Sequence, residues 1–97
     1  MGQVEGGTVV ISDSRWAGYK KTDRPVWFWV VENIQDELSE AGAPRGFRVE
    51  IIQRVKQEAL KQLSMRGDML NMREKHIPRV KEIYITVLEM FGSLILR

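Results

Sequence analysis

The residues that could carry out acid–base or nucleophilic chemistry are few and scattered in this chain. His76 is the single histidine and there is no cysteine, which excludes a thiol nucleophile and a zinc site with thiolate ligands. His76 could serve as a general base or as one metal ligand, but its basic surroundings shortly before Pro78 are typical of a loop residue beside a helix start. No serine lies in a Gly-x-Ser-x-Gly motif. We therefore predict no catalytic residues, no bound metal and no cofactor, and a protein that is not an enzyme.

Two further patterns could bind charged ligands. Four carboxylates, those of Glu32, Asp36, Glu37 and Glu40, are clustered and could attract a cation or a basic partner. We favour the alternative, a helix face in contact with solvent, since no EF-hand spacing is present. The pair Gly6–Gly7 precedes a β-branched run instead of following a strand, so it does not form a phosphate-binding loop.

Basic residues next to aromatic ones suggest nucleic-acid binding as an alternative function. Such neighbours can neutralise phosphates and stack on bases. The candidate contacts are Trp16, Tyr19, Lys20, Lys21, Arg24, Arg73, Lys75 and Arg79. The formal net charge is only +2 and no known nucleic-acid-binding motif occurs, so an ordinary charged exterior competes with this interpretation.

Large apolar side chains in excess of one helix face support our main functional hypothesis. On ideal helices Phe28, Trp29, Ile85 and Met90 point away from the main apolar stripes. Exposed apolar and aromatic groups are common at contact surfaces. We therefore predict a non-catalytic protein-interaction or self-assembling helical module, whose partner is another protein or a second copy of the chain, and we favour a homo-oligomer. The competing interpretation is that the N-terminal segment folds over these groups.

Hydrophobic periodicity predicts a mainly α fold with three helices, at residues 25–41, 45–66 and 78–96. In each segment, apolar residues recur every three or four positions and form one stripe. Such stripes bury each other in a three-helix bundle. One conflict remains within the first helix, because residues 26–31 are six apolar residues in a row and could form a strand. We favour helix because the stripe continues in phase to Ala41.

The chain before the first helix is expected to be less regular. Residues 1–7 read as a flexible tail, and residues 8–97 as a single domain whose N-terminal arm spans residues 8–24. Residues 8–20 suit either an extended arm or a short β-hairpin. No segment reaches the length of about 18 apolar residues that crosses a bilayer. We expect a soluble intracellular protein without a membrane partner.

Overall fold

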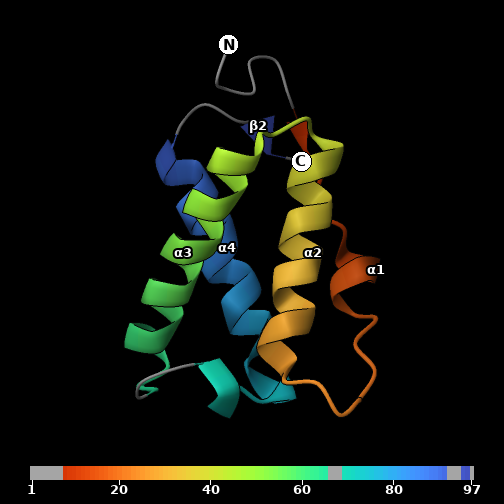
Figure 1. Ribbon diagram of the computed structural model, residues 1–97, viewed down its shortest axis with the longest axis vertical. Helices are drawn as coiled ribbons and strands as arrows, with labels where there is room; N and C mark the ends of the chain where they lie inside the picture. Colours follow the sequence, from red (N-terminus) through yellow and green to blue (C-terminus); the bar gives the residue numbers. More distant parts are fainter. Residues whose placement is uncertain (1–7, 66–68, 92–94, 97) are drawn as a thin grey trace.

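The chain folds into three main helices packed together, with an N-terminal arm along one side (Figure 1). The computed structural model describes residues 8–65, 69–91 and 95–96. The three main helices are α2 (Val26–Glu40), α3 (Arg45–Gln62) and α4 (Ile77–Phe91). Two 3-10 turns, η1 (Met69–Asn71) and η2 (Glu74–His76), lie on the connection between α3 and α4. The prediction of a mainly α fold is confirmed.

The apolar run at residues 26–31 is helical throughout, so the strand alternative is wrong. Pro25 occupies the position before α2. A backbone N–H at this position makes no hydrogen bond within the helix, so proline, which has no N–H, is tolerated there. The helix ends before Gly42, whose φ of +85° is readily adopted only by glycine. The amide of Gly42 then donates to the Ser39 carbonyl (2.9 Å), and that of Ala43 to the Leu38 carbonyl (2.9 Å), which satisfies the last carbonyls of α2.

The helices α3 and α4 differ from the predicted segments mainly at their C-terminal ends. Helix α3 stops at Gln62 instead of continuing to residue 66, because the backbone turns at Ser64 with a φ of +55°. Helix α4 begins at Ile77, which places Pro78 in the first turn, where proline is tolerated. It ends at Phe91, and residues 95–96 are extended instead of helical. The predicted tail at residues 1–7 and the helical prediction for residues 92–94 lie outside the described residues.

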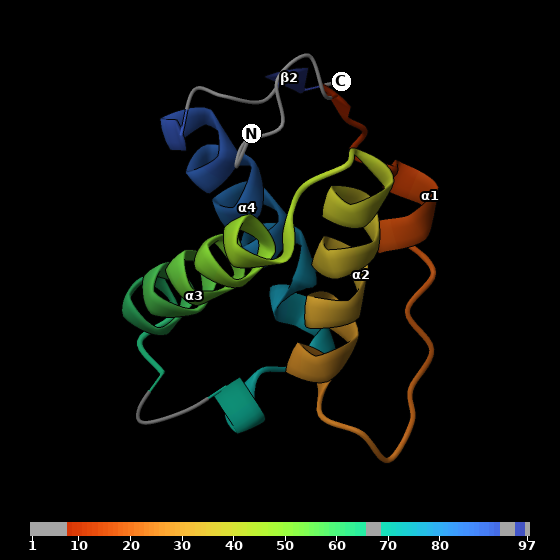
Figure 2. The same cartoon turned by 45° about the horizontal axis from the view of Figure 1, so that its top comes forward.

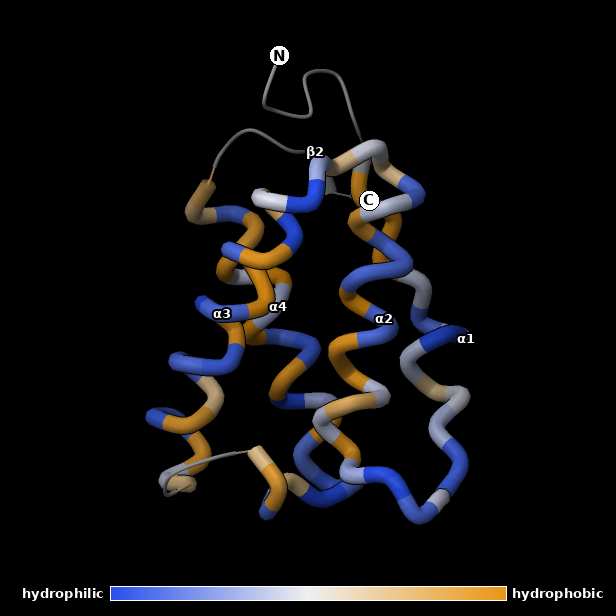
Figure 3. Tube along the Cα trace, in the orientation of Figure 1, coloured by the Kyte–Doolittle hydropathy of each residue, from blue (hydrophilic) through white to orange (hydrophobic). Residues whose placement is uncertain are grey.

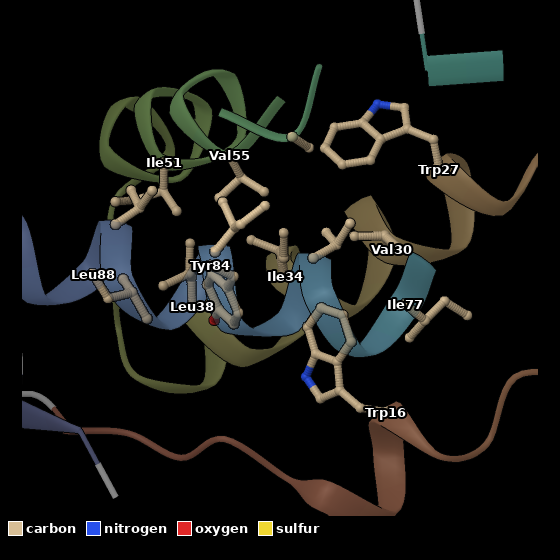
Figure 4. Close-up of a cluster of buried hydrophobic side chains, with 14 of the residues drawn as sticks. Trp16, Trp27, Val30, Ile34, Leu38, Ile51, Val55, Ile77, Tyr84 and Leu88 are labelled. Carbon is tan, nitrogen blue, oxygen red and sulfur yellow. The ribbon is translucent and has the colours of Figure 1, made fainter. Parts of the chain in front are cut away.

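The core is built from the three predicted stripes. Hydrophobic and hydrophilic residues alternate with the turns of each helix, as the colours of Figure 3 show. The fully buried residues that the stripes contribute are Val30, Ile34 and Leu38 from α2, Ile51, Val55 and Ala59 from α3, and Val80, Tyr84 and Leu88 from α4. Figure 4 labels all of them except Ala59 and Val80. Burying each of the larger side chains contributes about 1.5–3 kcal/mol. Within the described part of the chain, no helix is both long and apolar enough to span a membrane.

The N-terminal arm is not a β-hairpin. Its first residues form the strand β1 (Thr8–Val9), which pairs in parallel with β2 (Ile95–Leu96) from the far end of the chain. One helical turn, α1 (Asp13–Trp16), follows this strand. It lies in the segment for which either an extended arm or a short β-hairpin was predicted. Figures 1 and 2 both place α1 on the side of α2 that faces away from α3. The arm therefore covers a second face of α2.

Candidate functional site

The arm is attached to the bundle by an aromatic cluster. Ser12 begins α1, and its hydroxyl accepts a hydrogen bond from the Arg15 amide (3.2 Å). This turn directs Trp16 toward α4, where it packs beside Tyr84 with ring centroids 5.7 Å apart (Figure 4). Trp16 also meets Trp29 edge to face at 6.0 Å, and Tyr19 meets the same indole at 5.2 Å. Such pairs add about 0.5–1.5 kcal/mol each beyond burial.

A buried carboxylate lies under the same turn. Glu37 is only 1 % exposed, so its prediction as part of a solvent-facing acidic surface is wrong. Its Oε2 accepts hydrogen bonds from the Ser12 amide (2.9 Å) and from the Trp16 indole N–H (3.1 Å). Arg15 lies at 3.9 Å from the same oxygen and makes a closer ion pair with Glu40, at 2.8 Å. The carboxylate therefore links α2 to the arm at its first helical turn.

Burial dominates the electrostatics of this cluster. Loss of solvent raises the pKa of the Glu37 carboxyl above its ordinary value, although the bonds from Ser12 and Trp16 act in the opposite direction. Burial, with the nearby Glu37 charge, also raises the pKa of the Tyr84 phenol. The hydrogen bond to Glu40 raises the pKa of the Arg15 guanidinium, which stays charged. Because Glu37 and Tyr84 are closed off from solvent, we assign this cluster a structural role in holding the arm.

The predicted interface residues do not form one patch. Met90 is 72 % exposed on α4 and Phe28 is 44 % exposed on α2, where the Arg24 guanidinium lies over its ring at 5.6 Å. Ile85 is half-buried. Trp29 is also half-buried, with its indole against Trp16 and Tyr19 of the arm. The N-terminal segment thus folds over Trp29, as the competing interpretation expected. Met90 and Phe28 stay exposed.

A groove runs between α3 and α4, and Met90 lines it. It consists of two hollows, of about 210 Å³ and 130 Å³, which share Glu58, Val87 and Met90. Its other linings are Arg54 and Phe91 at one end, and Gln62, Arg79, Glu82, Ile83 and Thr86 at the other. Apolar side chains of α4 therefore form part of its wall, and charged groups of both signs surround them.

A separate hollow, of about 400 Å³, lies where the arm returns to the start of α2. It is lined by Tyr19, Lys21, Thr22, Asp23, Arg24, Pro25 and Val26 on one side, and by Leu70, Met72, Arg73 and Glu74 on the other. Four of the predicted nucleic-acid contacts line this space, namely Tyr19, Lys21 and Arg24 from the arm and Arg73 from the distant connection between α3 and α4. We call this space the basic hollow.

The remaining predicted nucleic-acid contacts are not all available at the basic hollow. Trp16 is 4 % exposed and engaged in the aromatic cluster, so its ring is not free to stack on a base in this structure. Arg79 instead binds Glu82 (3.0 Å) and Gln62 (2.6 Å) beside the α3–α4 groove. Lys20 lines a small neighbouring hollow, and Lys75 is exposed on η2. The structure therefore divides this set between several surfaces.

His76 holds the connection between α3 and α4. Its Nδ1 accepts a hydrogen bond from the Arg73 amide (2.9 Å) at the start of η2. Partial burial and the positive charges of Lys75 and Arg73 lower the pKa of the imidazole. No group of three or more His, Cys, Asp or Glu residues suited to a metal ion occurs within the residues that the structure describes.

The buried, arm-holding position of Glu37 was not predicted from the sequence, yet a signal for it exists. Trp29, Asn33 and Glu37 follow one another at intervals of four, which places them on one face of α2 opposite solvent-facing positions. Asn33 and Glu37 are both buried. A tryptophan and two polar residues on one helix face indicate a surface covered by another segment that carries its own polar groups.

No protein-family model, curated protein or solved structure matches this chain.

Proposed function

We propose that this chain is a non-catalytic helical module that associates with a second copy of itself through the groove between α3 and α4. The observation that carries the proposal is the position of Met90. It is 72 % exposed, the largest exposure among the described large hydrophobic side chains. It is not isolated, because the buried Val87 and the half-buried Phe91 line the same groove. An exposed methionine beside an apolar wall is typical of an adaptable contact surface.

The charges around the groove favour a second copy as the occupant. The lining contains two cations, Arg54 and Arg79, and two carboxylates, Glu58 and Glu82. A strongly charged partner would meet like charges on such a surface. A two-fold axis places the same surface opposite itself, so a neutral lining with both signs can satisfy its own charges. The charged groups that line the groove therefore sum to zero, and a second copy meets no net repulsion there.

The test compares two exposed apolar residues on helices. Met90→Glu places a charge in the groove, whereas Val49→Glu makes the same kind of change on α3 at a residue that is 47 % exposed and does not line the groove. Burying a methionine contributes about 1.5 kcal/mol or more. A dimer buries two copies of Met90, so Met90→Glu removes about 3 kcal/mol of binding free energy. The dimer dissociation constant should therefore rise roughly a hundredfold. Val49→Glu should leave the constant unchanged.

The measurement is sedimentation velocity over a wide range of chain concentrations, with circular dichroism to check that helix content is retained. Dimers of the unchanged chain that are lost in Met90→Glu and kept in Val49→Glu support the proposal. A chain that stays monomeric at millimolar concentration overturns it, as does equal weakening by both variants.

A further inference from the structure

We infer that the basic hollow binds a phosphodiester of single-stranded nucleic acid. Its lining brings Lys21 and Arg24 of the arm together with Arg73 of the connection between α3 and α4. Lys21 and Arg24 lie in the same loop before α2, whereas Arg73 comes from a segment far along the chain. The fold itself therefore gathers positive charge around a concave space, of the size that commonly takes a small ligand group.

The pairing state of these cations favours an external anion. Neither Lys21 nor Arg73 forms an ion pair with any carboxylate in the described part of the chain. Arg24 is held at 3.2 Å from Glu32 and over the Phe28 ring, which fixes its position beside the hollow. The neighbouring start of α2 has no acidic residue in its first turn and no side-chain cap. Its backbone dipole therefore adds to the positive potential supplied by the side chains.

The carboxylates of the hollow limit the charge of the ligand. Asp23 and Glu74 also line it, and Glu32, which pairs with Arg24, lines the neighbouring hollow beside Lys20. Over the two hollows, four cations therefore face three carboxylates. The excess is one positive charge. A phosphodiester carries one negative charge, whereas a nucleoside triphosphate carries several and would be repelled by Asp23 and Glu74. A nucleic-acid backbone therefore fits the charge balance better than a free nucleotide.

Aromatic groups beside the hollow favour a single strand over a duplex. Tyr19 lines both the basic hollow and a neighbouring space of about 100 Å³ that Lys20, Arg24 and Trp29 also line. Tyr19 and Trp29 are both half-buried. Aromatic rings next to cations are how single strands are held, with bases on the rings and phosphates on the charges. A duplex keeps its bases stacked inside and would offer only its backbone to these small concave spaces. The two hollows together form the inferred binding surface.

The test uses a fluorescein-labelled, mixed-sequence single-stranded oligonucleotide of about 12 nucleotides, which is within the usual site size. Fluorescence anisotropy is measured over a series of salt concentrations. Lys21→Gln with Arg73→Gln should lower the slope of log affinity against log salt by about 0.7–1.4, for the loss of one or two phosphate contacts. The matched control, Arg45→Gln with Lys61→Gln, removes the same charge from exposed positions on α3, away from the hollow. This control should keep the slope of the unchanged chain.

A third variant tests the aromatic contribution. Tyr19→Leu keeps an apolar group against Trp29 but removes the stacking ring, and we expect a loss of affinity of about tenfold. A thermal melt of each variant confirms that the fold is retained. Absence of binding at low salt overturns the inference, and so does an equal fall in slope for both double variants. Equal or tighter binding of a duplex of the same sequence, or of vesicles containing anionic lipid, also overturns it.

Discussion

Replacing Glu37 with leucine should separate the arm from the bundle, whereas replacing it with glutamine should not. Leucine removes the acceptor of the buried Trp16 indole N–H and of the partly buried Ser12 amide. Leaving a buried donor unpaired costs about 1–3 kcal/mol, and the partly exposed amide costs less because water can replace its partner. We therefore expect Glu37→Leu to lose about 2–4 kcal/mol of unfolding free energy. Glutamine keeps an acceptor oxygen in place and removes a buried charge, so it should stay within about 1 kcal/mol of the unchanged chain.

The assay is urea denaturation near pH 7, followed both by far-ultraviolet circular dichroism and by tryptophan fluorescence. The first signal reports the helices. The second reports all three tryptophans, of which Trp16 lies in the arm, Trp29 packs against the arm and Trp27 is buried in the bundle. In Glu37→Leu the fluorescence transition should move to lower urea than the helical transition, because the arm detaches first. If the leucine and glutamine variants are equally stable, the two donors do not depend on this carboxylate and the reasoning is refuted.

The same residue predicts how stability depends on pH. Burial raises the pKa of Glu37 in the folded chain above its ordinary value of 4.5, so the folded state takes up a proton more readily than the unfolded state. The ionised form therefore opposes folding at neutral pH. This cost is relieved as the pH falls through the raised pKa, and the relief is complete below the ordinary value. Glutamine does not titrate and serves as the reference. The unfolding free energy of the unchanged chain minus that of Glu37→Gln should therefore increase as the pH falls through this window.

Three further predictions concern the arm, the turn after α2 and the first turn of α3. Trp16→Ala should cost about 3–5 kcal/mol locally, and hydrogen exchange should show faster exchange in the arm than in α3; unchanged exchange in the arm would contradict the packing described for its ring. Gly42→Ala should lower the melting temperature, because the φ of +85° costs any other residue about 1 kcal/mol. Gly46→Ala should raise it by a similar free energy, since this glycine lies in the first turn of α3 with open space for a methyl group. Scanning calorimetry of both variants checks the opposite signs, and a shift in the same direction would be evidence against the backbone argument.

The helical segments were predictable because their signal is local. Val30, Ile34 and Leu38 recur at helical spacing and are buried in α2, as are Ile51 and Val55 in α3. The ends were harder to predict. The turn at Ser64 uses a left-handed backbone that serine seldom adopts, so no residue type announced it.

The candidate sites were only partly predictable. Met90 was correctly expected to be exposed, because an apolar residue off the stripe of a long helix has few ways to be covered. Trp29 also lies off the apolar stripe of its helix, yet Trp16 and Tyr19 of the arm cover it. Helical phase alone cannot distinguish these cases, since the covering segment comes from a different part of the chain.

The sequence by itself therefore determined the three helices and their inward faces, because backbone hydrogen bonding and side-chain periodicity act over a few residues. Only the tertiary structure decided that Glu37 is a buried anchor instead of a surface acid, and that Arg73 joins Lys21 and Arg24 around one hollow. Burial and electrostatic fields depend on distance in space. Segments far apart in sequence must first be folded against each other before either property exists.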